Sequence, residues 1–107
     1  MELHQYEIVL VDLDPTRGTE MKKTRPCAII SPDEMNRHLR TIVVAPITST
    51  SKPYPTRLPV NSGKVNGWLV LDQIQTIDRL RIINSLDILS PAEITKTKAI
   101  LKETYVD

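Results

Sequence analysis

Apolar residues along the chain occur in short runs separated by polar, often proline-containing turns, and this pattern predicts many strands and few helices. Runs of about four to eight apolar or β-branched residues between turn residues are typical of strands. The first run is continuous at Ile8, Val9, Leu10 and Val11, as expected of a strand that is buried on both faces or closes a small barrel. The predicted strands are Tyr6–Leu13, Arg25–Ser31, Thr41–Thr48, Arg57–Val60, Gly67–Asp72 and Ile82–Leu89.

Two Ser-Pro dipeptides, each followed by a glutamate, predict the starts of two helices. Ser31-Pro32-Asp33-Glu34 and Ser90-Pro91-Ala92-Glu93 have the spacing of a capping box, in which the serine accepts from a first-turn amide and the glutamate reaches back. The first helix is expected to end at about Leu39, and the second to run from Pro91 to about Tyr105. Turns are predicted at 61–66, around Gly63, and within 73–81.

The length and composition predict one small domain spanning residues 1–107, built as a barrel or sandwich. The chain has no Phe and only four aromatic residues, so Ile, Leu and Val must form the core. These residue types favour strands. The predicted fold class is therefore mostly β, with short helices.

The sequence argues against several classes of protein and site. Cys27 is the only cysteine, which rules out an internal disulfide or a cysteine zinc site, and its apolar surroundings predict a buried, inert thiol. His4, near a terminus expected to be mobile, and His38 offer neither metal-ligand spacing nor a partner carboxylate. With no signal peptide and no membrane-length apolar run, a cytoplasmic protein is expected. No metal or other cofactor is predicted.

Positive charge gathers in one loop although the formal net charge is only +1. Arg17, Lys22, Lys23 and Arg25 surround Gly18, and Glu20 is the only acid between them. A net charge this small does not predict nucleic-acid binding by itself. The local cluster does indicate a loop suited to an anion.

Several short motifs appear in the order found in the MazF/PemK/Kid family of toxin ribonucleases, and the chain resembles that family over nearly its whole length. No single motif is decisive, but their order and separation together are specific. The matching segments are Asp14-Pro15, Gly18-Thr19-Glu20, Arg25-Pro26, Ser31-Pro32, Asn36, Ala45-Pro46-Ile47-Thr48-Ser49 and Leu71-Asp72-Gln73-Ile74-Gln75-Thr76-Ile77-Asp78.

The resemblance implies an SH3-like small β-barrel with a C-terminal helix, used as a homodimer. It further implies a toxin of a toxin-antitoxin pair that cleaves single-stranded RNA, mRNA in particular, at specific sequences without a metal. The ribose 2′-hydroxyl would attack the adjacent phosphorus and leave 2′,3′-cyclic phosphate and 5′-hydroxyl ends. The implied protein partner is a MazE-like antitoxin whose acidic, partly disordered segment would suit basic loops.

The resemblance makes Arg25 and Thr48 the matched catalytic pair. Arg25 suits phosphate, because its guanidinium is always charged and its planar fork matches two oxygens, although an ion pair with Glu20 is an equally good interpretation from residues alone. Thr48 can donate a neutral hydrogen bond, or simply bond its own backbone at the strand end. Glu20 is a candidate base, or else a solvated loop acid.

The remaining candidates are expected RNA contacts and positions at which members of the family differ. The expected RNA contacts are Arg17, Thr19, Lys22, Ser49, Lys52 and Gln73. Some family members have a histidine and an arginine at the positions held here by Thr19 and Val70, so Asp72 lacks those partners and is a candidate for a structural role. Trp68 lies in an apolar strand and is expected in the core.

Two other functions stay open at the level of sequence. One is a non-enzymatic toxin like the related CcdB family, which binds DNA gyrase, with the terminal helix as the contact surface. The other is a degenerate module that binds RNA or antitoxin without cleaving. The Arg-Pro strand and Thr48 favour the ribonuclease.

Overall fold

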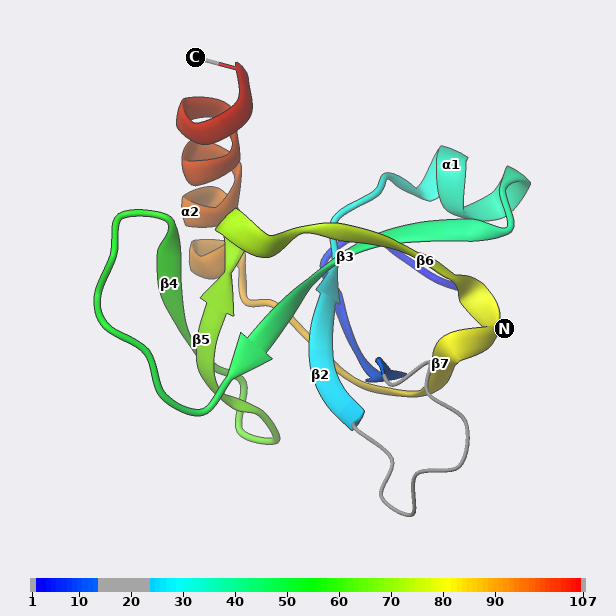
Figure 1. Cartoon of the computed structure of the whole chain (residues 1–107), viewed down its shortest axis with the longest axis horizontal. Coiled ribbons are helices and arrows are strands. Elements are labelled where there is room, and N and C mark those ends of the chain that lie inside the picture. Colours follow the sequence, from blue (N-terminus) through cyan, green and yellow to red (C-terminus); the bar gives the residue numbers. More distant parts are fainter. Residues whose placement is uncertain (1, 14–23, 107) are drawn as a thin grey trace.

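The computed structural model describes residues 2–13 and 24–106, and in these residues antiparallel strands form one strongly curved sheet (Figure 1). The strands are β1 (Glu7–Asp12), β2 (Thr24–Ile29), β3 (Thr41–Thr48), β4 (Arg57–Asn61), β5 (Asn66–Val70), β6 (Gln75–Asp78) and β7 (Ile82–Ile88). The helical elements are α1 (Asp33–His38), α2 (Pro91–Leu101), the 3₁₀ turns η1 (Leu71–Gln73) and η2 (Arg79–Arg81), and the π-helical turn η3 (Lys102–Val106).

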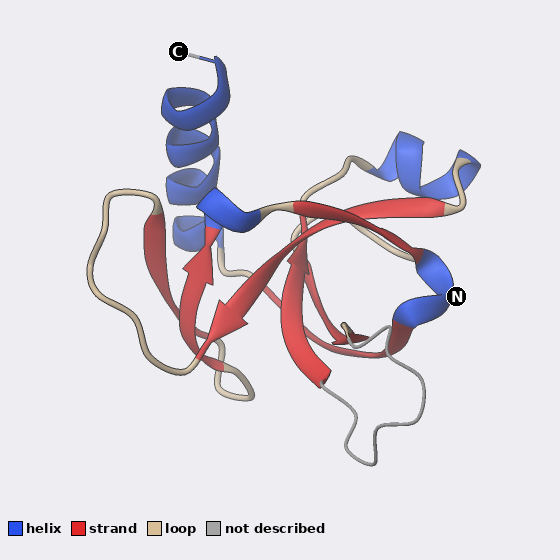
Figure 2. Cartoon of the chain, in the orientation of Figure 1, coloured by secondary structure: helices blue, strands red, loops and turns tan. Residues whose placement is uncertain are grey.

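Strand β3 is the centre of the sheet, which runs in the order β4-β5-β3-β2-β1-β7. The first half of β3 also pairs with β6, and its last two residues pair with β5. One long strand therefore belongs to both parts of the sheet, which curves into a half-barrel beside α2 (Figure 2). The predicted mostly β fold with a C-terminal helix is confirmed.

The core lies on both faces of the central strands. Ile8 and Ala28 belong to one buried cluster, beneath α2, while their neighbours Val9 and Cys27 belong to a second cluster on the other face. Alternate side chains of a strand point to opposite faces, so two buried faces require apolar residues at consecutive positions. This explains the uninterrupted apolar run in β1, and both clusters are built from small and aliphatic side chains.

Segment 73–81, predicted as a turn, contains strand β6. This strand pairs with β3, from Thr41 opposite Asp78 to Val44 opposite Gln75. Only Ile77 of its four residues is buried, so the apolar pattern that marks a strand is too weak to see in the sequence. The preceding strand, predicted over 67–72, ends at Val70 because the next three residues form η1.

The capping box of the terminal helix is confirmed, whereas the one predicted for the first helix is wrong. In α2, Ser90 Oγ accepts from the Glu93 amide at 3.1 Å and the Glu93 carboxylate accepts from the Ser90 amide at 2.8 Å. Ser31 instead donates to the buried Asn36 amide oxygen at 2.6 Å and accepts from the Val43 amide. Because Ser31 is used in this way, α1 starts later and has no side-chain cap.

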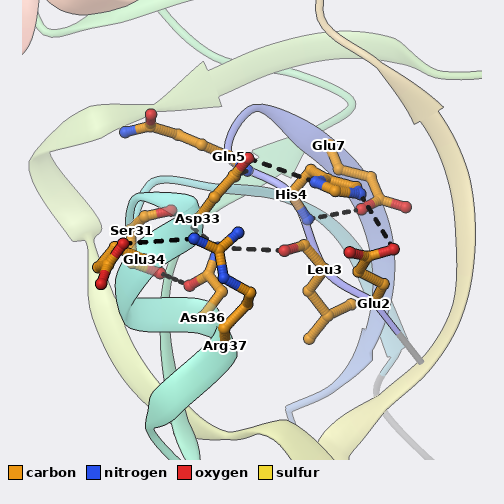
Figure 3. A network of polar contacts seen from close by, with 10 residues as sticks. All are labelled: Glu2, Leu3, His4, Gln5, Glu7, Ser31, Asp33, Glu34, Asn36 and Arg37. Atoms are coloured by element: carbon orange, nitrogen blue, oxygen red, sulfur yellow. Dashed lines mark hydrogen bonds and ion pairs between the residues drawn. The ribbon is translucent and has the colours of Figure 1, made fainter.

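The N-terminal segment is tied to α1, contrary to the expectation of mobility around His4 (Figure 3). The Gln5 amide donates to Asp33 Oδ1 at 2.7 Å, and Asn36 Nδ2 donates to the Leu3 carbonyl at 3.5 Å. The hydrogen bond from the Gln5 amide, followed by His4, lowers the pKa of Asp33.

The histidines also have carboxylate neighbours, which corrects a second expectation. His4 Nδ1 lies 3.4 Å from Asp33 Oδ2, and His38 Nε2 lies 3.7 Å from Glu34 Oε2. Among the described residues, no three His, Cys, Asp or Glu side chains gather as a metal site requires. The described helices include none that is long and apolar enough to cross a membrane.

Candidate active site

Arg25 lies near the start of β2, where the chain enters the sheet. Its neighbour Pro26 occupies an early position in the strand, where a missing amide donor is tolerated. Arg25 itself is exposed and forms no ion pair with an acid in the described part of the chain. No described acid therefore competes with an anionic ligand for its guanidinium. The predicted alternative partner, Glu20, lies outside the described residues.

Thr48 is the last residue of the neighbouring strand β3. In the β2–β3 ladder Cys27 is opposite Pro46, so continuing the same register by two residues brings Arg25 level with Thr48. The Thr48 hydroxyl donates to the Thr50 carbonyl at 2.9 Å, the local bond expected of a threonine at a strand end. It must rotate away from that carbonyl to donate to a bound ligand.

A pocket of about 240 Å³ joins Arg25 and Thr48. Its wall contains both side chains together with Ser49, a predicted RNA contact. The other lining residues are Thr24, Pro26, Ile47 and Asn66. The pocket thus combines a guanidinium with hydroxyl and amide groups, a set that can hold an anionic, hydrogen-bonding ligand.

Gly67 allows β5 to approach the end of β3 beside this pocket. A Cβ added at Gly67 would lie 2.3 Å from the Thr48 carbonyl oxygen and 3.1 Å from Ile47 Cγ2. Neighbouring Trp68 pairs with Thr48 across the two strands. Since no side chain fits at Gly67 without moving backbone, this glycine helps to define where Thr48 sits.

A second polar cluster fastens the far end of the loop that follows Thr48. Arg57, at the start of β4, contacts Asp72 through two nitrogens, Nε to Oδ1 at 3.1 Å and Nη2 to Oδ2 at 3.2 Å. Its remaining nitrogen donates to Ser51 Oγ at 2.8 Å, and its guanidinium carbon lies 4.9 Å from the centre of the Tyr54 ring. We call Ser51, Tyr54, Arg57 and Asp72 the loop clamp.

The loop clamp gives Asp72 the structural partner that the sequence did not reveal. The hydrogen bonds from Arg57, assisted by one from Thr56, lower the pKa of Asp72, and the same carboxylate raises the pKa of Arg57. The two residues are fifteen positions apart and meet because Arg57 pairs with Val70 in the β4–β5 ladder. The sequence contains no signal for this contact.

The other predicted site residues are distributed as follows. Lys52 and Gln73 are exposed but do not line the pocket. Trp68, expected in the core, is only partly buried and belongs to neither core cluster. The predicted candidates that fall outside the described residues are Arg17, Thr19, Glu20 and Lys22.

The prediction that Cys27 is buried is confirmed. It has no exposed surface, and burial raises the pKa of the thiol to about 12, an effect that the nearby Arg25 charge only partly offsets. A buried thiol that stays protonated is a poor nucleophile, so Cys27 is not among the candidate catalytic groups.

Comparisons with known proteins agree with the motif order and the fold. Residues 4–105 match the model of the PemK-like, MazF-like toxin of type II toxin-antitoxin systems. The chain belongs to this family. The endoribonuclease toxin MazF of Escherichia coli strain K12 is 30% identical over 94 residues, which cover 87% of this chain and 85% of that relative.

Solved structures of MazF proteins share the fold. A crystal structure of MazF from Deinococcus radiodurans superposes with a TM-score of 0.84 at 21% identity, covering 100% of this chain and 99% of that one. An endoribonuclease in complex with its cognate antitoxin, from Mycobacterial species, gives a TM-score of 0.82 at 22% identity, covering 94% and 92%. The SH3-like barrel of the MazF family is therefore the fold of this chain.

Proposed function

We propose that this MazF-family chain is the toxin of a toxin-antitoxin pair and acts as a metal-independent endoribonuclease on single-stranded RNA, mRNA in particular. The observation that carries the proposal is the pocket that holds Arg25 and Thr48 together. The names of the relatives add support, because they describe endoribonucleases. With mRNA as its substrate, the toxin would act in the cytoplasm.

In the proposed reaction the ribose 2′-oxygen attacks the neighbouring phosphorus and the bond from phosphorus to the 5′-oxygen breaks. The products are a 2′,3′-cyclic phosphate and a 5′-hydroxyl. The 2′-hydroxyl gives up its proton to a base, for which we propose Glu20, and the leaving 5′-oxygen gains a proton.

Arg25 is the main electrostatic group in this reaction. Its guanidinium can contact two phosphate oxygens as negative charge grows on them in the transition state. Thr48 adds a neutral donor once its hydroxyl turns from the Thr50 carbonyl toward the phosphate. Arg17, Thr19, Lys22, Ser49, Lys52 and Gln73 are the proposed RNA contacts around this centre.

The alternative functions receive less support. The relatives from Escherichia coli and Staphylococcus epidermidis are both named endoribonucleases, and neither name describes a gyrase-binding toxin. A degenerate binding module would not need Arg25 and Thr48 in one pocket. We further propose that a homodimer is the active form and that an acidic antitoxin segment covers the RNA site.

The test is incubation of the purified protein with a long single-stranded RNA in EDTA, followed by mapping of the fragment ends. Discrete cuts with cyclic phosphate ends are expected from the native chain and a loss of about 100- to 1,000-fold in rate from Arg25→Ala. Arg37→Ala, which removes an exposed arginine of α1 that does not line the pocket, is the matched control. Intact RNA with the native protein would rule out the nuclease.

A further inference from the structure

Tyr54 is an exposed aromatic ring that several independent contacts hold in one place. It lies in the loop between β3 and β4, and 48% of its surface is exposed. An ordered side chain that buries little surface gains little from the hydrophobic effect in return for its lost freedom. Its fixed position therefore calls for an explanation other than packing.

The backbone around Tyr54 is fixed by two short turns. The Tyr54 amide donates to the Lys52 carbonyl at 2.8 Å, and the Arg57 amide donates to the Tyr54 carbonyl at 3.0 Å. Pro53 and Pro55 flank the tyrosine and restrict the backbone further. The second turn has proline in the position where its fixed φ is most favourable.

The ring itself is held by Arg57. The guanidinium carbon is 4.9 Å from the ring centre, within the range of a cation–π contact. Arg57 cannot easily swing away, because Asp72 binds it through two nitrogens and Ser51 accepts from a third. Only 19% of the Arg57 side chain is exposed, so this partner is far more fixed than a surface arginine.

Comparison with Tyr105 shows what is unusual about Tyr54. Tyr105 is exposed to a similar extent, 50%, but its hydroxyl donates to the Leu71 carbonyl at 2.7 Å and ties η3 to η1. The Tyr54 hydroxyl has no hydrogen-bond partner among the described residues. The Tyr105 hydroxyl thus has a structural use, whereas the Tyr54 hydroxyl has none among the described residues.

The position of Tyr54 connects it to the proposed RNA site. The loop starts at Thr48 in the pocket, continues through Ser49 and Lys52, and reaches the start of β4 beside η1 (Figure 1). Unpaired bases stack on exposed aromatic rings, and basic side chains nearby attract the strand. A rigid ring at the far end of this loop suits a base some way from the cleaved phosphate.

We propose that Tyr54 is a stacking site for an unpaired base of the RNA substrate, and that Arg57 and Asp72 fix the position of its ring. The inference rests on the proposed ribonuclease function and adds a binding position outside the pocket. One face of the ring is covered by Arg57, and the base lies on the exposed face. Arg57 and Asp72 are positioning residues that act through Tyr54.

The experiment measures binding of an RNA that spans the mapped cleavage site and carries a 2′-deoxy nucleotide at the cut, so that it cannot be cleaved. Tyr54→Leu is expected to weaken binding about 5- to 100-fold, since it keeps bulk but removes the ring face. Tyr54→Phe should bind as the native chain does, because the hydroxyl has no partner among the described residues. Tyr105→Leu is the control for loss of an equally exposed tyrosine.

Abasic substitutions, placed one at a time along the RNA, identify the stacked base. At one position, the abasic substitution should weaken binding to the native chain but should not weaken binding to Tyr54→Leu any further. A tyrosine with a purely structural role would not produce this coupling. Arg57→Lys should reduce the same coupling, because lysine supplies neither the planar contact nor the two-pronged bond to Asp72. Circular dichroism checks that each variant is folded.

The outcomes separate this inference from the proposed function. If the native chain leaves RNA intact in EDTA, the ribonuclease proposal fails first. If the native chain cleaves RNA and Tyr54→Leu binds RNA as tightly as Tyr105→Leu does, only the stacking site is overturned. The exposed ring would then be better explained by contact with a protein partner. If binding weakens but no abasic position is coupled to Tyr54, base stacking is likewise overturned.

Discussion

At the scale of single residues, the site depends on what each side chain does before a ligand arrives. Thr48 uses its hydroxyl on the Thr50 carbonyl, whereas Arg25 has no acidic partner among the described residues. A donor already bonded must break that bond before it helps a substrate, so its net contribution is smaller than that of a free charged donor. The arginine should therefore matter more than the threonine.

Arg25→Lys tests whether geometry or charge is what the site needs. Lysine keeps the positive charge but cannot present two parallel N–H groups to phosphate oxygens. We expect RNA binding to change little while the cleavage rate falls about 100-fold or more. Single-turnover cleavage and equilibrium binding, measured on the same RNA, separate the two effects. A lysine variant that cleaves at the native rate would mean that a point charge suffices.

Cys27 gives a second prediction at this scale, about the reactivity of its thiol. Because the thiol is buried and its pKa is raised to about 12, the native protein should react with a thiol reagent at pH 8 only when it opens or unfolds. Absorbance of the released thiolate of Ellman's reagent measures the rate. The same reagent in guanidinium should react at once, and fast labelling of the native chain would contradict the burial of Cys27.

At the scale of elements, the sequence predicted strands best where burial is two-sided. The third strand, Thr41–Thr48, has the bounds that were predicted, because its residues are apolar along most of their length. β6 was missed because Ile77 is its only buried residue, and the start of α1 was misplaced because a buried Asn36 competes for Ser31. Local patterns do not contain such tertiary competition.

The same limit applies to the site. The placement of Arg25 and Thr48 in one pocket was predictable, since both lie at strand ends and both match the family motifs. The contact between Arg57 and Asp72 was not, because it arises from the β4–β5 register and the η1 turn that follows it. A long-range ion pair has no periodic signature along the chain.

Gly67→Ala tests how closely β5 sets the end of β3. The added methyl must displace the Thr48 carbonyl, and overpacking of this kind costs about 1–3 kcal/mol. We expect slower cleavage with unchanged RNA affinity. The loss should also be smaller when Gly67→Ala is combined with Thr48→Val, because the hydroxyl proposed to act in cleavage is then already absent.

Gly63→Ala is the matched control, since it lies in the same hairpin but has open space around it. Its φ of +94° makes alanine strained there, so this variant loses stability without pushing on Thr48. Thermal melting and cleavage, measured together, distinguish the two glycines. Equal loss of cleavage in both variants at equal stability would show that Gly67 has no special relation to the site.

The Arg57–Asp72 pair predicts a dependence of stability on pH. Hydrogen bonds from Arg57 lower the pKa of Asp72 in the folded chain, so its stabilising effect is complete above the unfolded value of about 3.9 and is lost as the pH falls through the lower folded value. Asp72→Asn should therefore be less stable than the native chain at pH 7, and the difference should shrink in acid. Urea unfolding at a series of pH values measures it, and a difference that is constant with pH would contradict it.

At the scale of the whole molecule, one edge of the sheet is poorly covered. Strand β7 pairs with β1 alone in the described part of the chain, and large apolar side chains are exposed on it and just before it. Leu80 is 78% exposed and Ile83 is 48% exposed. Edge strands with exposed apolar residues are normally covered or blunted, because they otherwise promote unwanted pairing. In the proposed homodimer, a second copy of the chain would cover this edge.

Leu80→Lys is therefore expected to weaken the dimer, because a charge cannot be buried in an apolar contact without a partner. Sedimentation velocity over a range of protein concentrations should show a shift toward monomer. The melting temperature of the native chain should rise with concentration, since association stabilises the folded state. Val106→Lys is the control: Val106 is 73% exposed but lies in η3, away from β7 in the chain. If both variants assemble as the native chain does, the surface around Leu80 is not the dimer contact, and the uncovered edge of β7 needs another partner.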